Sequence, residues 1–143
     1  AWSFYNSFRE YIGNGQFDLD GTSVGFYVAL HTSAASANVN TKTLSTYASL
    51  GNEVSNGNGY ATGGASVTAR TWASVATDKY RFDSTAVVWT ATGGDISNVK
   101  YAVIYQSGGK LVCFSKLTTA QFTLAQDNTL TVTPSASGIF ELA

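Results

Sequence analysis

Hydrophobic and polar residues alternate in short runs along much of the chain. The cleanest alternation lies at residues 79–83, where charged side chains alternate with the rings of Tyr80 and Phe82. A period of two places one set of side chains toward a core and the other toward solvent, so the rings are expected to point inward. The other predicted strands are residues 24–32, 65–72, 87–89, 99–106, 110–116, 122–124, 129–133 and 138–142.

The number and spacing of these runs indicate that the protein is mainly β. About eight short strands separated by turn residues predict an antiparallel β-sandwich or open barrel. Residues 65–72 are expected to form one continuous strand, and residues 107–109 (Ser-Gly-Gly) are expected to close a hairpin. No linker divides the sequence, so residues 1–143 are expected to form a single domain.

One segment has a helical pattern instead. Phe4, Phe8 and Ile12 recur every four residues within residues 2–12, which predicts a short N-terminal helix. The following Gly-Asn-Gly sequence ends it. A further helical turn is predicted near residues 44–48, where Leu44 and Tyr47 are spaced by three.

A polar, glycine-rich stretch at residues 51–64 separates the first part of the chain from the strand-rich second part. Four glycines and three asparagines lie between residues 52 and 64, and these residue types enter left-handed backbone conformations at low cost. Val54 and Tyr60 provide apolar anchors within the stretch. We therefore expect an ordered connection with tight turns, whereas a flexible surface loop is the alternative.

Charged residues make up only 12% of the 143 residues, and the formal net charge is −1. No basic cluster is present, so no nucleic-acid partner is expected. No apolar run reaches the ~18–20 residues of a membrane helix, so no membrane partner is expected either. The single cysteine, Cys113, lies in an apolar run and is expected to be a small buried hydrophobe. One cysteine and no basic-then-apolar leader favour folding in the cytoplasm.

The sequence predicts no catalytic, cofactor-binding or metal-binding residue. His31 is the only histidine and ends a predicted strand, where a structural role is expected. The sequence Asp18-Leu19-Asp20-Gly21 resembles the start of a calcium loop but lacks the later ligands, so a turn is expected. A carboxylate pair for glycoside cleavage remains an alternative, because pairing happens in space. Its members would come from Asp78, Asp83, Asp95 and Asp127.

Several short motifs follow one another along the chain. They are WSFYNSFREYIGNG at 2–15, DLD at 18–20, VALHTS at 28–33, NEV at 52–54, GY at 59–60, GG at 63–64, WTATGG at 89–94, YAVIY at 101–105 and SGIF at 137–140. In this order they resemble a family of small structural proteins of tailed bacteriophages. The resemblance implies a non-enzymatic component of the virion. The turn at residues 107–109 is shorter than the segment that relatives often have there.

Within that family the leading hypothesis is a capsid decoration, or cement, protein in the virion, assembled in the cytoplasm of the bacterial host. Its expected partners are the major capsid protein and further copies of itself, consistent with a surface of low charge. The alternative is a tail, fibre or spike component that binds a host-surface glycan or receptor, and exposed aromatic rings in a groove would favour it. A glycan-cleaving virion enzyme is a third hypothesis and needs a cleft with paired carboxylates.

Aromatic residues near the N-terminus provide the candidate interface. One helix turns one stripe toward its own sheet, so with Phe4 and Phe8 inward other rings are left for a partner. The alternative is that the helix is wedged between elements and buries all of its rings within the domain. The candidate interface residues are Trp2, Tyr5 and Tyr11, together with Val54 and Tyr60.

Overall fold

The computed structural model describes residues 1–21, 23–33 and 39–143, and it confirms the predicted fold class. The chain is mainly β, with 43% strand and 8% helix. Its sheets are antiparallel, and one short α-helix lies near the N-terminus. The architecture is that of a β-sandwich.

The elements follow one another closely along the chain. The helical elements are α1 (Asn6–Gly13) and the 3₁₀ turn η1 (Tyr47–Ser49), which lies near the predicted turn. The strands are β1 (Trp2–Phe4), β2 (Phe26–His31), β3 (Ala65–Ser66), β4 (Thr71–Ala76), β5 (Lys79–Asp83), β6 (Val87–Thr90), β7 (Ile96–Val99), β8 (Tyr101–Gln106), β9 (Lys110–Lys116), β10 (Phe122–Leu124), β11 (Thr129–Val132) and β12 (Phe140–Leu142).

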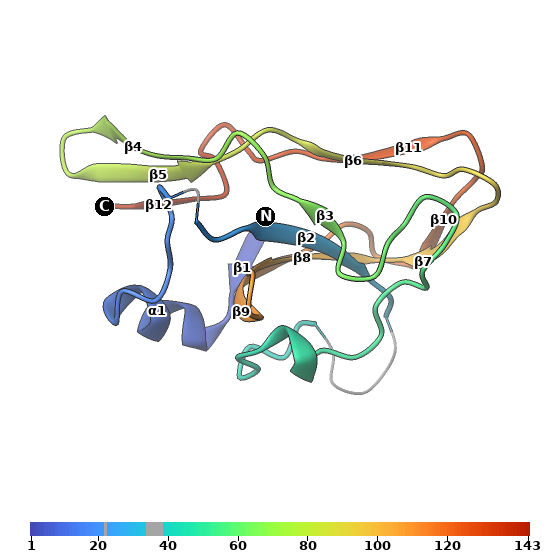
Figure 1. Ribbon diagram of the computed structural model, residues 1–143, viewed down its shortest axis with the longest axis horizontal. Helices are drawn as coiled ribbons and strands as arrows, with labels where there is room; N and C mark the ends of the chain where they lie inside the picture. The colour runs from blue at the N-terminus through green and yellow to red at the C-terminus, as the bar shows by residue number, and fades with distance from the viewer. Residues whose placement is uncertain (22, 34–38) are drawn as a thin grey trace.

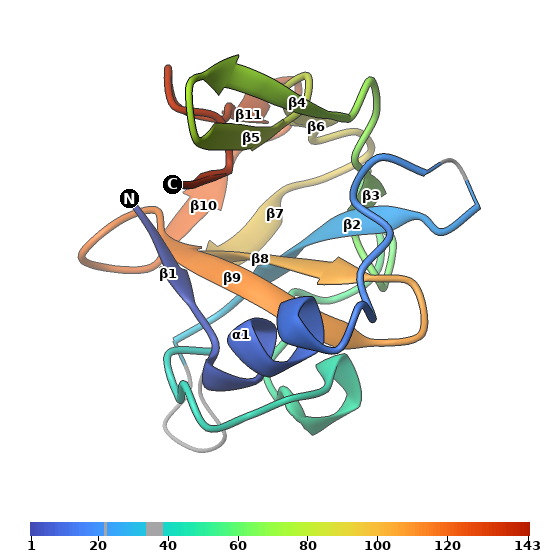
Figure 2. The ribbon, with the colours of Figure 1, turned by 90° about the vertical axis from the view of Figure 1, so that its left-hand side faces the viewer.

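Two layers of strands face each other (Figure 1). One is a five-stranded sheet in the order β1-β9-β8-β2-β3. The other combines the three-stranded sheet β12-β5-β4 with the pair β11-β6. The pair β10-β7 lies at one end of the sandwich, and α1 lies at the other end beside β1 and β9 (Figure 2). The β8–β9 hairpin confirms the predicted turn at residues 107–109.

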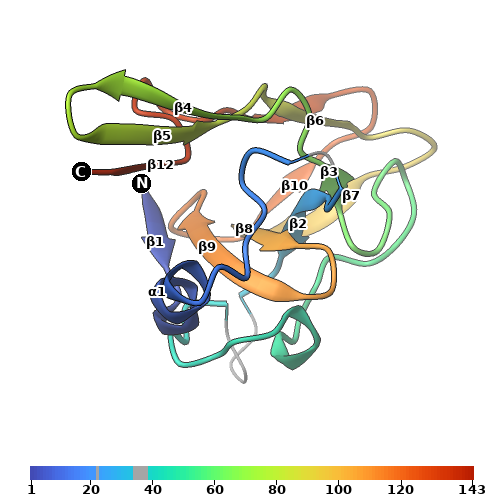
Figure 3. The ribbon, with the colours of Figure 1, turned by 60° about the vertical axis from the view of Figure 1, so that its left-hand side comes forward.

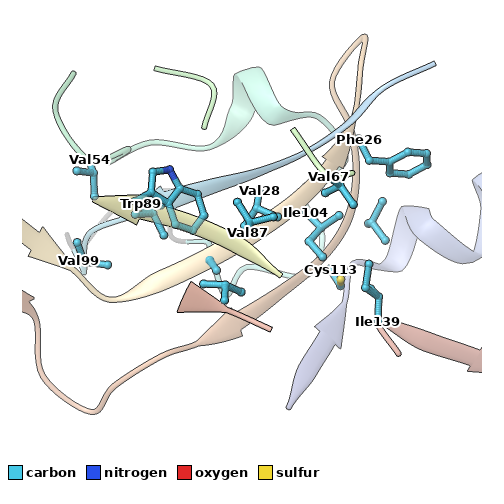
Figure 4. Packing of buried hydrophobic residues seen from close by; sticks show 14 of the residues in the cluster. Phe26, Val28, Val54, Val67, Val87, Trp89, Val99, Ile104, Cys113 and Ile139 are labelled. Atoms are coloured by element: carbon cyan, nitrogen blue, oxygen red, sulfur yellow. The ribbon is translucent and has the colours of Figure 1, made fainter. Parts of the chain in front are cut away.

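Buried hydrophobic side chains from both layers form an inner cluster, part of which is shown in Figure 4. Val28 and Ile104 from the five-stranded sheet meet Val87 and Trp89 from β6. Cys113 belongs to this cluster and is fully buried, as predicted, and burial raises the pKa of its thiol. The thiol is therefore a small packed group and not a reactive one.

A second, outer cluster covers the opposite face of the five-stranded sheet. It is defined by Tyr5, Ala29, Val39, Tyr101, Val103, Tyr105, Leu111 and Phe114. Leu44, Tyr47 and Leu50 pack against it from the segment around η1. Strand β8 is consequently buried on both faces, which is why its sequence is a continuous apolar run instead of an alternation.

An irregularity in β9 lets one strand serve both clusters. The register between β8 and β9 shifts so that Ile104 pairs with Cys113 while Tyr105 pairs with Leu111, leaving Val112 unpaired. Such a β-bulge changes the alternation of side chains between faces. Val112 and Cys113 both join the inner cluster, although they are neighbours in sequence.

The predicted helix at residues 2–12 is wrong at its start. Trp2, Ser3 and Phe4 form β1, which pairs with Ser115, Phe114 and Cys113 of β9. The spacing that predicted a helix still has a physical cause, because the rings of Phe4 and Phe8 stack with centroids 4.8 Å apart. A strand followed at once by a helix thus brings both rings to the same end of the sandwich.

Two predicted strands are broken in the structure. Residues 65–72 separate into β3 and β4, since Ala69 has a left-handed backbone with φ +48° that no continuous strand accommodates. Residues 99–106 divide at Lys100, between β7 and β8. Both breaks move the chain from one sheet to another, which local alternation does not reveal.

The stretch at residues 51–64 is ordered by contacts with the sandwich. All four of its glycines after residue 52 have positive φ, as do Asn52 and Asn58. The Val54 N–H donates to the carbonyl oxygen of Leu30 at 2.9 Å, and the Thr92 N–H donates to that of Asn58 at 3.0 Å. The expectation of tight left-handed turns is therefore confirmed.

Gly64 and Gly93 form a matched pair for testing whether residues 51–64 are ordered by contacts with the sandwich. Both have nearly the same left-handed φ, +78° and +77°, but only Gly64 lies against backbone, where a Cβ would overlap the Val28 carbonyl oxygen. We expect Gly93→Ala to cost about 1 kcal/mol from the left-handed strain alone. Gly64→Ala should cost about 2–4 kcal/mol, since overlap adds to that strain. Denaturant unfolding of both variants is the measurement, and equal costs would show that residues 63–64 do not pack as described.

Candidate interaction surface

Three of the five predicted interface residues lie inside the protein. Tyr5, Val54 and Tyr60 are all buried in the described structure, with at most 3% of each residue exposed. They are unavailable to a partner, and this part of the interface prediction is wrong. Their burial has a common cause, since each side chain is fixed by groups that lie far away in the sequence.

Tyr5 belongs to the outer cluster because β1 ends just before it. Its hydroxyl donates to the carbonyl oxygen of Val39 at 2.7 Å, and its ring packs against Phe114 at 5.2 Å. Its backbone N–H donates to the bulged Val112 carbonyl oxygen at 3.2 Å. Burial raises the pKa of the Tyr5 hydroxyl, so the group is a neutral donor.

Tyr60 connects the stretch at residues 51–64 to β2. Its hydroxyl accepts the Leu30 N–H at 3.0 Å and donates to Glu53 Oε1 at 2.7 Å. Glu53 Oε1 also accepts the Gly63 N–H at 2.6 Å. Burial raises the pKa of Tyr60, and the neighbouring Glu53 carboxylate raises it further. Glu53 Oε1 therefore binds both Tyr60 and Gly63, at the two ends of residues 60–63.

The rings around this network form a stack across the outer cluster. Tyr105 stacks on Tyr47 with centroids 3.9 Å apart and on Tyr27 at 5.6 Å. Its hydroxyl donates to the Gly63 carbonyl oxygen at 2.7 Å. Burial, followed by the charge of Glu53, raises the pKa of Tyr105 to about 12. Tyr105 therefore packs and hydrogen-bonds as a neutral group near neutral pH.

His31 ends β2, as predicted, and is buried beside the stack. Its Nδ1 lies 3.1 Å from the Gly51 carbonyl oxygen, which assigns the proton to that nitrogen. Its ring meets Tyr47 edge to face at 5.8 Å. Burial lowers the pKa of His31, so the ring is neutral near pH 7 and fills space at the end of the strand.

Trp2 and Tyr11 are partly exposed and remain interface predictions. Trp2 lines a shallow hollow of about 380 Å³ with Leu117 and Thr131. The Tyr11 ring meets Phe17 edge to face at 5.7 Å, and its hydroxyl lies 3.5 Å from the Ser45 carbonyl oxygen. Both rings also pack within the chain, so each can offer only part of its surface.

The largest uncovered apolar side chains lie in the three-stranded sheet β12-β5-β4. Its first cross-strand row, Trp72, Phe82 and Phe140, packs on the inner cluster. The next row on the same face pairs Ser74 with Tyr80 and Tyr80 with Leu142. Tyr80 is 47% exposed and Leu142 is 40% exposed.

The arrangement of the layers explains this exposure. The β4–β5 hairpin and β12 extend beyond the ends of β1 and β9, and no described strand lies opposite their protruding part (Figure 3). Side chains that would be core residues over the five-stranded sheet thus become surface residues here. We call the surface formed by Tyr80, Leu142 and the neighbouring Trp72 the overhang face. The ring centroids of Trp72 and Tyr80 lie 5.4 Å apart.

The charges of this sheet lie on its opposite face. Arg81 donates from Nε and a terminal nitrogen to Glu141 Oε1 at 2.9 and 2.7 Å, and Lys79 Nζ lies 3.2 Å from Glu141 Oε2. Hydrogen bonds from Arg81 and Lys79 hold the pKa of Glu141 below its usual value. Since strand side chains alternate between faces, the overhang face itself is uncharged.

A separate polar hollow of about 270 Å³ lies between the stretch at residues 51–64 and β7. Amide, hydroxyl and carboxylate side chains line it, among them Asn56, Asn58, Asp95 and Ser97. No aromatic ring is among its lining residues, so it lacks the feature that would favour a glycan groove. The part of the chain that the structure describes contains no cluster of metal-ligating side chains, and none of its helices is long and apolar enough to span a membrane.

The acidic residues considered for glycoside cleavage occupy turns and strand ends. Asp78 and Asp127 have left-handed backbones with φ +60° and +68°, at turn positions that suit Asp. Asp83 Oδ1 accepts the Ser84 N–H at 2.8 Å, and Asp95 Oδ1 accepts the Gln126 N–H at 2.9 Å. Each of the four thus has a local structural role.

Sequence reasoning missed the overhang face because it placed both rings of residues 79–83 inward. Phe82 is fully buried, whereas Tyr80 is exposed on the same face. Alternation identified the correct face but carried no information on where the opposing layer ends.

Comparison of the chain with protein-family models, curated proteins and solved structures finds no match in any of the three.

The hydrogen bonds at Glu53 can be tested by replacing Tyr60 with Phe, with the same replacement at Tyr11 as the control. Tyr60→Phe leaves the Leu30 N–H without its acceptor and removes one of the two hydrogen bonds to Glu53 Oε1, so we expect a loss of about 1–3 kcal/mol in unfolding free energy. Tyr11→Phe removes only a long, part-buried contact and should cost less than about 0.5 kcal/mol. Urea unfolding measures both, and a Tyr60 variant as stable as the Tyr11 variant would show that the network contributes nothing.

Proposed function

We propose that the protein is a non-enzymatic structural component of a tailed-phage virion, and that it is a capsid decoration protein bound to the outer face of the major capsid lattice. The observation that carries the proposal is the overhang face, where Tyr80 and Leu142 stand uncovered in an uncharged row. Aromatic side chains flanked by apolar neighbours are favoured anchors at the centre of protein interfaces.

The backbone pairing beneath the overhang face is suited to binding a capsid subunit as a rigid surface. The overhang face is held by antiparallel pairing across three strands, and its base is fixed by Phe82 and Phe140 in the inner cluster. A preorganised sheet loses little conformational freedom when it docks. The low charge of the chain further reduces the cost of removing polar groups from water.

Stabilisation of the head follows from selective binding. A decoration protein that binds the expanded shell and not its precursor stabilises the expanded form by mass action. The effect grows with the concentration of the free protein relative to its dissociation constant. No chemical step is required of the bound chain.

The alternative function is a tail, fibre or spike component that recognises a host glycan. The polar hollow beside Asn56 and Asn58 supplies hydrogen-bonding groups, but its lining includes no ring on which a sugar would stack. The overhang face has rings but is an open sheet surface. The geometry therefore favours a protein partner over a glycan.

Tyr80→Ser and Leu142→Ser test the overhang face, with Val88→Ser as the matched control. Val88 is also an exposed apolar residue, 53% accessible, but it lies on β6 outside the overhang face. We expect each overhang variant to weaken binding to expanded heads about tenfold or more, as loss of an interface anchor does. The control should bind as the wild type does. Occupancy on purified expanded heads, measured by co-sedimentation, reports the result.

Two outcomes would contradict the proposal. In one, the wild-type chain leaves expanded heads bare and attaches to tails or to a host glycan. In the other, the overhang variants fold and occupy heads to the same extent as the Val88 control. Circular dichroism and thermal melting of each variant show whether its fold is retained.

A further inference from the structure

The longest free edge in the described sheets belongs to β4. It has six residues and ends the sheet β12-β5-β4, with no strand paired on its outer side. Five of its six residues are exposed, so no other described part of the chain covers this edge. Its N–H and C=O groups on that side are free to pair with another strand.

The other free edges in the described sheets are shorter and less exposed. Strands β1, β10 and β12 have three residues each and β3 has two. Strands β6, β7 and β11 have four residues each, of which only two are exposed. Short edge strands give an incoming chain few hydrogen bonds, which is one common way in which proteins avoid unwanted pairing. The edge of β4 lacks this protection.

β4 also lacks the charges that usually protect an exposed edge. Its sequence, Thr-Trp-Ala-Ser-Val-Ala, contains no charged residue and no proline. Asp78 and Lys79 lie beyond it, in the turn and in β5. The bulge at Val75 limits regular pairing to residues 71–74, where the register with β5 is unbroken.

We propose that two copies of the chain pair through β4, antiparallel and around a two-fold axis, to form one continuous sheet in the order β12-β5-β4-β4-β5-β12. This inference is independent of capsid binding, because it concerns the purified chain alone. The overhang faces of the two copies would then lie on the same side of the joined sheet, since a two-fold axis perpendicular to a sheet preserves its faces.

A second copy is the occupant that the charge pattern favours. In an antiparallel pair of identical strands, a residue near the two-fold axis lies opposite the same residue of the other copy, or opposite one of its near neighbours. A single Lys or Asp in β4 would therefore lie close to a like charge. β4 is neutral throughout, so no like charges of its own would meet in such a pair. Antiparallel pairing of identical strands also matches each free donor with an identical free acceptor in the other copy.

The test places charge at the end of the proposed pairing segment, residues 71–74, and on the adjacent bulge residue. Ser74→Lys with Val75→Lys should place like charges at the pairing edge, and sedimentation equilibrium should show a dimer dissociation constant at least about tenfold larger. Ser74→Glu with Val75→Glu should have the same effect. An equal mixture of the two variants should restore dimers, because opposite charges then meet. Val88→Lys with Thr90→Lys adds the same charge on β6 and should leave dimerisation unchanged.

A wild-type chain that is monomeric across micromolar concentrations would overturn the proposal. So would lysine variants that dimerise as the wild type does, or a mixture that stays monomeric while each variant is folded. If the charged variants fail to fold, amide hydrogen exchange of the wild type decides. Protection at residues 71–74 should rise with concentration, and concentration-independent exchange there would reject the β4 pairing.

Discussion

The structure depends on the burial of one strand, β8, on both of its faces. Ala102 and Ile104 belong to the inner cluster, while Tyr101, Val103 and Tyr105 belong to the outer one. Both clusters are thereby anchored to one backbone, and displacement of β8 would disturb both. The bulge at Val112 and the turn held by Glu53 are local adjustments that let neighbouring segments fit around this strand.

The three-stranded sheet β12-β5-β4 is covered by the opposite layer over only part of its length. Phe82 and Phe140 lie over the five-stranded sheet and are buried, but in the next row along the same strands Tyr80 is 47% exposed and Leu142 is 40% exposed. Exposed apolar side chains in a sheet with an unprotected neutral edge are unfavourable for an isolated chain. The proposed function and the proposed self-pairing therefore both place a partner at this sheet.

Much of the fold was predictable because it depends on local patterns. Alternation located β5, turn residues located the β8–β9 hairpin, and Gly and Asn marked the left-handed turns of residues 51–64. The candidate interface was less predictable, since burial is set by distant partners. Tyr5 is buried by Val39 and Phe114, and Tyr60 by groups of β2, and no spacing in the sequence announces these contacts.

We propose that the overhang face meets the capsid while the doubly covered sheet supports it. An electron-microscopy reconstruction of expanded heads incubated with the purified chain is the decisive measurement. We expect density on the outer surface of the shell, with β12, β5 and β4 nearest to the capsid subunits and Tyr80 and Leu142 turned toward them. Density confined to the tail, or a bound chain that presents the N-terminal helix or the polar hollow to the shell, would contradict it.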